Sequence, residues 1–128
     1  MHDITEKITA VTNTSLRFFN AEVSSLYDSL AAGGHGYCGI AANFYPQLLV
    51  WLCRHHRDDP EKARRLQRFF SVAEFAVDYK YPTSAKYFLR AIGVADILPV
   101  CRVHNVEISE HDQRGLMHLS EWIATLHI

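Results

Sequence analysis

Hydrophobic residues recur at helical spacing along the N-terminal part of the chain, with short breaks between the helical stretches. Residues 2–12 place their aliphatic side chains on one side of a predicted helix, and residues 23–32 do the same before Gly33 and Gly34, which favour the end of a helix. Between them, Leu16–Phe19 is a compact apolar run typical of a short strand. The pattern predicts a helix, a strand and a second helix.

A second strand is predicted where small uncharged residues replace the helical pattern. The segment Gly36–Ala42 carries no charge, and such a run is typical of a parallel strand that is buried on both faces. Asn43 is a suitable N-cap, and Pro46 suits the first turn of a helix that ends near residues 54–57. The first half of the chain is therefore predicted to alternate helix, strand, helix, strand and helix.

The second half of the chain is predicted to be helical. One helix begins at the cap Asp58–Pro60 and ends before Tyr81–Pro82, and another follows as far as Gly93. After an extended connection, Ser109 and Asp112 form a predicted capping box for a last helix. The apolar stripes of the first and last of these helices consist of Ala63, Leu66, Phe70, Ala73 and Val77, and of Leu116, Leu119, Ile123 and Leu126.

Two short parallel strands do not make a stable sheet by themselves, because both edges and much of both faces stay without partners. Other copies of the chain, or a larger protein of which the chain is a part, are expected to supply the neighbouring strands.

Composition and charge exclude several classes of protein. The 128 residues are 48% hydrophobic and 21% charged, as in a soluble globular domain, and they fall short of the ~250 residues of a complete eight-stranded α/β barrel. Lys and Arg number 13 against 14 Asp and Glu, so no net field favours nucleic acid or an anionic membrane. Three cysteines without a CxxC pair, and no signal sequence or membrane span, predict a cytoplasmic protein with free thiols.

Metal, nucleic-acid and Schiff-base chemistry each lack their usual residues. The eight histidines form no metal-binding spacing, and acidic residues interrupt the basic run from Arg54 to Arg68, which we interpret as a solvated helix face. No lysine lies in a predicted strand, where desolvation would free an amine to attack a carbonyl. Cys38, near the carboxyl end of a predicted parallel strand, has two open interpretations, a small hydrophobic residue or part of the lining of a site.

Four stretches of the sequence resemble one family of enzymes. The segment LAAGGHGYCGIAANFYPQLL has that family's order of glycines, strand and Ala-Asn, and DDPEKARRLQ, YPTSAKYFLRAIGV and ILPVCRVHNVEIS follow at the right distances. From Leu16 onward the chain looks like the last part of the dihydrodipicolinate synthase and N-acetylneuraminate lyase family, which are Schiff-base aldolases. The resemblance implies an α/β fold, with the last two parallel strands of a (β/α)8 barrel and their helices in residues 1–56 and a C-terminal helical extension in residues 57–128, joined as one continuous unit.

The resemblance also places candidate site residues. Leu16–Phe19 would be the seventh strand, and the mouth of the barrel after it contacts the distal part of the substrate in this family. Tyr37–Ala41 would be the eighth strand, where a backbone carbonyl, here that of Cys38, lies near the keto-acid carboxyl end. The implied substrate-binding residues are Asn20, Glu22, Cys38, Gly39 and Ile40.

The Schiff-base lysine, relay tyrosine and carboxylate-binding loop of this family belong to earlier strands, so no residue of this chain fills those roles. Met1 would fall in the helix after the sixth strand. We therefore expect the C-terminal segment of a pyruvate-dependent lyase that forms or breaks a carbon-carbon bond, inactive alone, without cofactor or metal, and assembling as a homo-oligomer. The alternative is a non-catalytic helical interaction module that assembles through its strand edges and the apolar stripe of residues 63–77.

Overall fold

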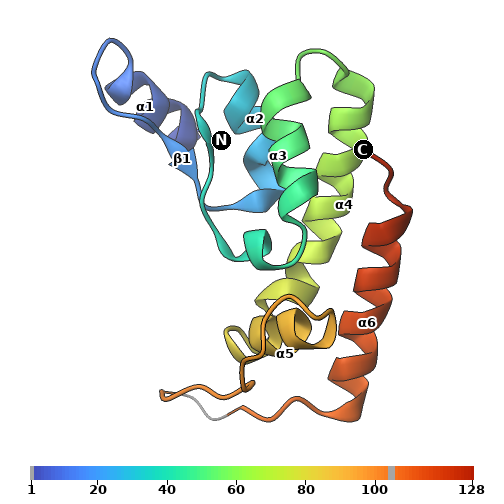
Figure 1. The fold of residues 1–128 in the computed structure, drawn as a ribbon. Coiled ribbons are helices and arrows are strands. Elements are labelled where there is room, and N and C mark those ends of the chain that lie inside the picture. The colour runs from blue at the N-terminus through green and yellow to red at the C-terminus, as the bar shows by residue number, and fades with distance from the viewer. Residues whose placement is uncertain (1, 104–105) are drawn as a thin grey trace.

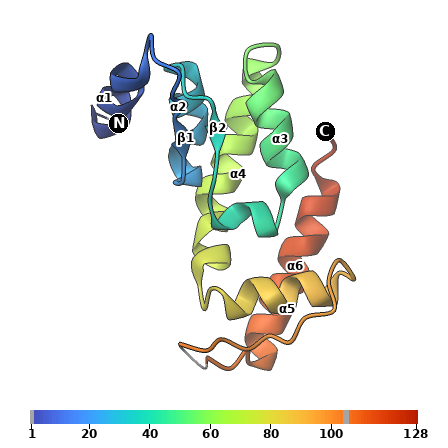
Figure 2. The same ribbon diagram turned by 60° about the vertical axis from the view of Figure 1, so that its left-hand side comes forward.

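The computed structural model of the chain describes residues 2–103 and 106–128, and helices dominate it (Figure 1). The strand pair lies between the first helix and a layer of helices, and the last helix runs along the far side of that layer (Figures 1 and 2). The elements are α1 (His2–Val11), β1 (Phe19–Asn20), the 3-10 turn η1 (Val23–Ser25), α2 (Leu26–Ala31), β2 (Gly36–Tyr37), the 3-10 turn η2 (Ile40–Asn43), α3 (Pro46–His55), α4 (Pro60–Asp78), α5 (Thr83–Ala91) and α6 (Glu110–Thr125).

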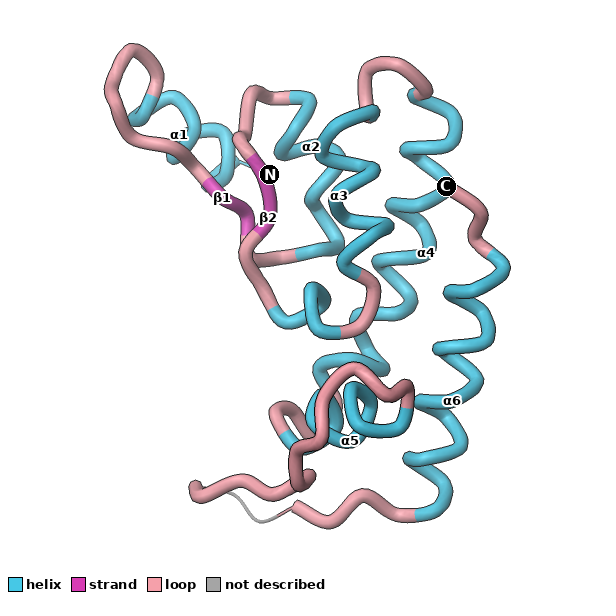
Figure 3. The backbone as a smooth tube through the Cα atoms, in the orientation of Figure 1, coloured by secondary structure: helices cyan, strands magenta, loops and turns pink. Residues whose placement is uncertain are grey.

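The two strands pair in parallel, as the sequence predicts, but they are short (Figure 3). Phe19 lies opposite Gly36, and Asn20 lies opposite Tyr37. The Cys38 N–H extends the ladder by donating to the Asn20 carbonyl oxygen (2.9 Å). The predicted alternation of helices with two parallel strands is confirmed, whereas residues 16–18 of the first predicted strand lie outside β1.

The second predicted strand is wrong beyond Tyr37, because the chain turns into η2 at Ile40. The Tyr37 hydroxyl accepts a hydrogen bond from the Ala41 N–H (3.2 Å) and so holds the turn against the end of β2. A side chain of the strand itself therefore ends the extended conformation.

Helix α3 begins at Pro46, as predicted, but Asn43 is not its N-cap. Tyr45 holds the N-cap position, with no side-chain capping bond. The Asn43 side-chain amide instead donates to the Ile40 carbonyl oxygen within η2 (2.9 Å). The prediction for Asn43 is wrong because its side chain is used inside its own turn.

The predicted helix over residues 23–32 is divided into η1 and α2, and Gln67 of α4 explains the division. The Gln67 amide nitrogen donates to the carbonyl oxygens of Val23 (2.9 Å) and Ser24 (2.7 Å), and its amide oxygen accepts from the Tyr27 N–H (2.7 Å). These backbone groups are those that a continuous helix would pair internally. The predicted end of the helix is confirmed, since Gly33 has a φ of 102°.

The hydrophobic core surrounds α4, whose predicted stripe is buried throughout. Asp59 caps the helix as predicted, because its side chain accepts from the Lys62 N–H (3.0 Å). At the centre, the Tyr45 ring stacks on Phe70, with ring centroids 5.2 Å apart and an interplanar angle of 8°. The core includes residues from both predicted parts of the chain, 1–56 and 57–128. The division between these two parts stays a prediction. Its main members are Val23, Leu26, Leu30, Phe44, Tyr45, Leu48, Leu52, Leu66, Phe69, Phe70, Val77, Phe88, Leu116 and Leu119.

The N-terminus of α6 is fixed by the predicted capping box and by an ion pair that the sequence pattern does not indicate. The Ser109 side chain accepts from the Asp112 N–H, and the Asp112 carboxylate accepts from the Ser109 N–H (2.8 Å). The Lys80 ammonium also donates to Asp112 Oδ2 (2.6 Å). Hydrogen bonds from Lys80 and Ser109 lower the pKa of Asp112 from 3.8 to about 2.

This lowered pKa predicts a contribution to acid stability. The pKa of Asp112 is lower in the folded chain than in the unfolded chain. The contribution of Asp112 to the free energy of unfolding is therefore complete above about pH 4 and is lost as the pH falls toward 2. Circular dichroism can follow urea unfolding between pH 5 and 2.5. We expect the urea midpoint to decrease less steeply with falling pH in the Asp112→Asn variant than in the parent chain. An unchanged slope in the variant would contradict the assignment of this titration to Asp112.

Candidate active-site wall

One face of the strand pair is open, and it carries side chains from both strands. Phe19 and Gly36 are paired and so share a face, and Cys38 returns to that face two residues later. The Phe19 side chain is 51% exposed and Cys38 is exposed. Phe19 and Cys38, together with Lys7 of α1 and Arg17, line a wide groove of about 900 Å³ between α1 and the strands.

The structure corrects the expectation that the second strand is buried on both faces. Cys38 is exposed because β2 has a single neighbouring strand among the described residues and because nothing covers its face toward the groove. Of the two interpretations left open for Cys38, its position agrees with the lining of a surface and not with a buried hydrophobic residue.

Asn20 lies on the opposite face of the strand pair and is buried, with 4% of its surface exposed. Its amide nitrogen donates to the Ser25 hydroxyl (3.0 Å), and its amide oxygen accepts from the Glu22 N–H (3.0 Å). Asn20 therefore holds the loop that follows β1. Because both ends of its amide are engaged, we assign it a positioning role.

Glu22 is exposed at the start of this loop. Its carboxylate accepts a hydrogen bond from the Ser24 hydroxyl (3.1 Å) and lies 3.4 Å from the Ser25 hydroxyl. The Asn20 contact fixes the backbone of Glu22, while the carboxylate faces solvent at the end of β1. Glu22 is thus the candidate residue that keeps an accessible charged group at this end of the strands.

Gly39 lies where the loops after the two strands meet, and Ile40 turns away from the groove. A Cβ atom at Gly39 would lie 2.5 Å from the Ala21 carbonyl oxygen and would collide with the Tyr37 hydroxyl. Ile40 is half-buried and packs against the hydrophobic core. The structure therefore brings Cys38 and Gly39 together near the end of β1 but directs the Ile40 side chain into the core.

Tyr37 is a residue of this region that the sequence interpretation missed. Burial raises the pKa of its phenol, so the hydroxyl keeps its proton at neutral pH. In addition to accepting from Ala41, this hydroxyl lies where a side chain at Gly39 would be. An aromatic residue two positions before a glycine was the available signal, but only the folded turn shows that the two are in contact.

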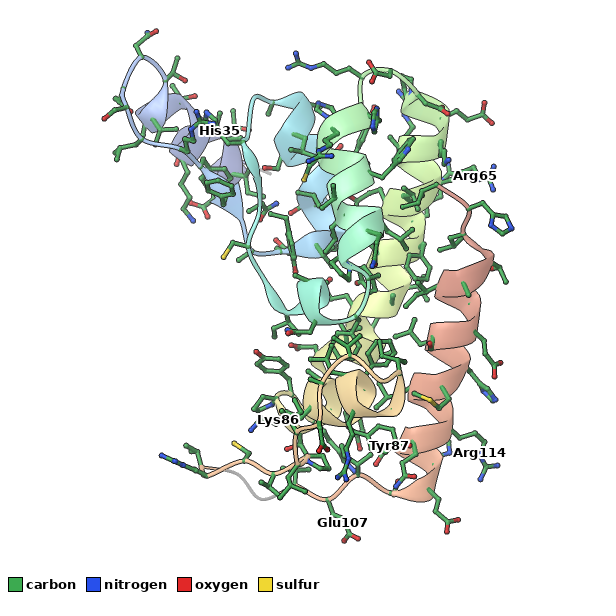
Figure 4. All side chains as sticks on the ribbon, viewed as in Figure 1. His35, Arg65, Lys86, Tyr87, Glu107 and Arg114 are labelled. Carbon is green, nitrogen blue, oxygen red and sulfur yellow. The ribbon has the colours of Figure 1, made fainter. Side chains whose placement is uncertain are left out.

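The ammonium group of each lysine of the chain already has a partner. Lys7 pairs with Asp3 on the surface of α1 (2.6 Å), and the Lys62 ammonium lies over the Trp51 ring, 4.7 Å from its centroid. Hydrogen bonding to Asp112 raises the pKa of Lys80, which opposes nucleophilic use at neutral pH. Figure 4 shows Lys86 on α5, far from His35 beside the strands, and its ammonium donates to the Val100 carbonyl oxygen (2.6 Å).

Metal and membrane sites are likewise not found in the part of the chain that the structure describes. No group of three or more His, Cys, Asp or Glu side chains among residues 2–103 and 106–128 is arranged to hold a metal ion. In the same residues, no helix has the length and hydrophobicity needed to cross a membrane.

The order of elements defines the class of fold. A parallel strand pair joined through helices and followed by a helical extension fits the last part of a (β/α)8 barrel, and the match to solved structures described below confirms this predicted fold class. Neither a protein-family model nor a curated protein sequence matches the chain.

Solved structures of dihydrodipicolinate synthases share this fold. A monomeric dihydrodipicolinate synthase variant matches with a TM-score of 0.80 at 21% identity, over 98% of this chain and 42% of its own. The Thermotoga maritima enzyme matches with a TM-score of 0.79 at 22% identity, over 98% of this chain and 43% of its own. A putative dihydrodipicolinate synthetase from Pseudomonas aeruginosa matches with a TM-score of 0.72 at 26% identity, over 93% of this chain and 41% of its own. The chain thus has the fold of a C-terminal part of these proteins and spans about two-fifths of their length.

Proposed function

We propose that the chain is the C-terminal segment of a pyruvate-dependent lyase of the dihydrodipicolinate synthase type. The observation that carries this proposal is the match of 98% of the chain to 42% of a dihydrodipicolinate synthase structure. The open face and edges of the strand pair support it, because strands of the remaining barrel would cover them. In a cell, we propose that the assembled protein is cytoplasmic and forms homo-oligomers.

In this proposal the segment forms one wall of the barrel mouth. The Cys38 carbonyl and the Glu22 carboxylate face the substrate, while Asn20 and Gly39 hold the loops that carry them. The Schiff-base chemistry belongs to the rest of the barrel. There a lysine amine adds to the ketone of pyruvate and water leaves, and the resulting iminium withdraws electrons from the carbon-carbon bond that forms or breaks.

The segment alone is expected to be inactive. Treatment of the purified chain with pyruvate and sodium borohydride should leave its mass unchanged, because none of its lysines is desolvated beside the open face. The full Thermotoga maritima enzyme serves as the positive control, since borohydride should trap its adduct. A reduced pyruvate adduct on any lysine of the 128-residue chain would contradict this expectation.

Association with the missing part of a barrel tests the proposal directly. We expect the chain to co-purify with a separately expressed segment carrying the first six strands of a dihydrodipicolinate synthase, and borohydride to trap pyruvate on that segment. A Phe19→Asp variant should lose this association, because Phe19 lies on the open face. A Val72→Asp variant should keep this association, because Val72 is exposed on α4. Association that Phe19→Asp leaves unchanged would contradict the proposal.

A second candidate function is a non-catalytic interaction module, and one observation favours it. The outer face of α4 exposes Val72 (60%) and Phe75 (82%), and Tyr79 directly after the helix is 57% exposed. The sequence predicts that such a module assembles through the apolar stripe of residues 63–77. This stripe is instead buried inside the chain, so the prediction that it forms an assembly surface is wrong. Light scattering after size-exclusion chromatography distinguishes the two functions, since a cooperatively unfolding oligomer supports the module and aggregation supports an incomplete barrel.

A further inference from the structure

A small pocket lies away from the strands, where the end of α4 meets the beginnings of α5 and α6. Its volume is about 250 Å³, below the ~300–1,000 Å³ typical of sites for drug-sized ligands. Ala76, Ile108 and Leu116 supply apolar walls, and Lys80, Ser84 and Asp112 supply polar groups. Gly115 also lines the pocket, and a Cβ atom added there would meet nothing within 4 Å.

Ser84 gives this pocket an unused hydrogen-bonding group. Its side chain is 2% exposed, and its hydroxyl oxygen has no hydrogen-bond partner among the described residues. A buried hydroxyl without a partner destabilises a fold, because the group has left water without compensation. A ligand that accepts a hydrogen bond from Ser84 would remove this cost.

The electrostatic surroundings favour a negatively charged acceptor. The Lys80 ammonium is fixed at the wall by Asp112 and by the Glu107 carbonyl oxygen (3.0 Å). Ser84 lies in the first turn of α5, and Asp112 lies in that of α6, so the positive ends of two helix dipoles converge here. The one carboxylate, that of Asp112, is already compensated by Lys80 and by the Ser109 N–H and hydroxyl.

The backbone at this pocket is also held in an uncommon conformation. Lys80 has a φ of 56°, in the left-handed region that non-glycine residues rarely occupy. The side chain of the same residue contacts Asp112 and Glu107, and residues in such conformations concentrate at binding sites.

We propose that this pocket binds a small monocarboxylate with a short apolar chain. The ligand carboxylate accepts a hydrogen bond from the Ser84 hydroxyl and lies near Lys80, and its hydrocarbon part contacts Ile108 and Leu116. The site is independent of the barrel mouth proposed above, because its residues come from α4, the turn between α4 and α5, α5, the segment before α6, and α6.

Sodium isovalerate is a suitable probe, since its branched chain and single carboxylate match the size and the polar groups of the pocket. In heteronuclear NMR of the full chain, we expect titration to shift the amide signals of residues 80, 81, 83 and 84 and of residues 111–116. Isovaleramide, which has the same shape without the charge, should bind at least about fivefold more weakly. Equal shifts with the amide, or with sodium chloride at the same concentration, would overturn the proposal.

Two serine variants supply a matched comparison. Ser29 is also fully buried with an unpartnered hydroxyl, but it lies outside the pocket. Ser84→Ala should weaken isovalerate binding about tenfold, the value of a hydrogen bond to a charged group, and should leave the melting temperature unchanged or raise it. Ser29→Ala should leave binding unchanged. Equal binding by the two variants would overturn the assignment of Ser84 as the ligand's donor.

Discussion

Replacement of Phe70 by alanine is expected to remove a large part of the stability of the chain. Phe70 is fully buried, stacks on Tyr45 and meets the Phe69 ring edge-on, with centroids 5.8 Å apart. Truncation of a buried phenylalanine costs about 3–5 kcal/mol, through lost transfer energy and the cavity that is left. A small domain has only about 5–15 kcal/mol in total. Urea unfolding followed by circular dichroism at 222 nm measures the difference.

Phe75 provides the control for this substitution on the same helix. It is the same residue type in α4 but 82% exposed, so Phe75→Ala should change the free energy of unfolding by less than about 0.5 kcal/mol. Similar losses in the two variants would mean that the α4 face toward Tyr45 is not the core of the chain in solution.

The elements predicted well from the sequence are those whose signals lie within the element itself. Helix α4 is the clearest case, because Asp59, Pro60 and a stripe at helical spacing determine its start and its buried face. The capping box at Ser109 is equally local. These signals need no knowledge of the rest of the fold, and the structure confirms each of them.

The elements predicted poorly depend on contacts between distant residues. Helix α2 begins late because the Gln67 side chain, 44 residues after Val23, binds the backbone that a longer helix would use. Strand β2 ends early because the Tyr37 hydroxyl holds the following turn. Hydrophobic periodicity contains no information about either contact.

The candidate site divides in the same way. The resemblance supplied the positions, but the exposure of Cys38 depends on how many strands surround β2, which the periodicity of the chain cannot show. The inward turn of Ile40 and the engaged amide of Asn20 follow from the packing of the loops after the strands. The resemblance marks Asn20 as a substrate contact, which stays a prediction, while its hydrogen bonds show that it supports the backbone of Glu22.

Replacement of Gly39 by alanine is expected to separate the loops that form the candidate site. The added methyl group would lie 2.5 Å from the Ala21 carbonyl oxygen, a backbone atom that moves only if the end of β1 moves. Such overpacking costs typically about 1–3 kcal/mol. Because Cys38 donates its N–H to Asn20 beside this contact, the strand pair should loosen first, and hydrogen exchange of the Cys38 amide should accelerate.

Gly115→Ala is the matched control, because the same methyl group there meets open space within helix α6. Alanine in the interior of a helix is more favourable than glycine by about 0.5–1 kcal/mol, so this variant should be more stable than the parent chain. The two variants thus differ in the sign of their effect on the urea midpoint, although the chemical change is identical. A Gly39→Ala chain with unchanged stability and unchanged Cys38 exchange would show that the loops after β1 and β2 are not in contact in solution. The proposed barrel wall would then lack the contact that holds the loop after β1 against the loop after β2.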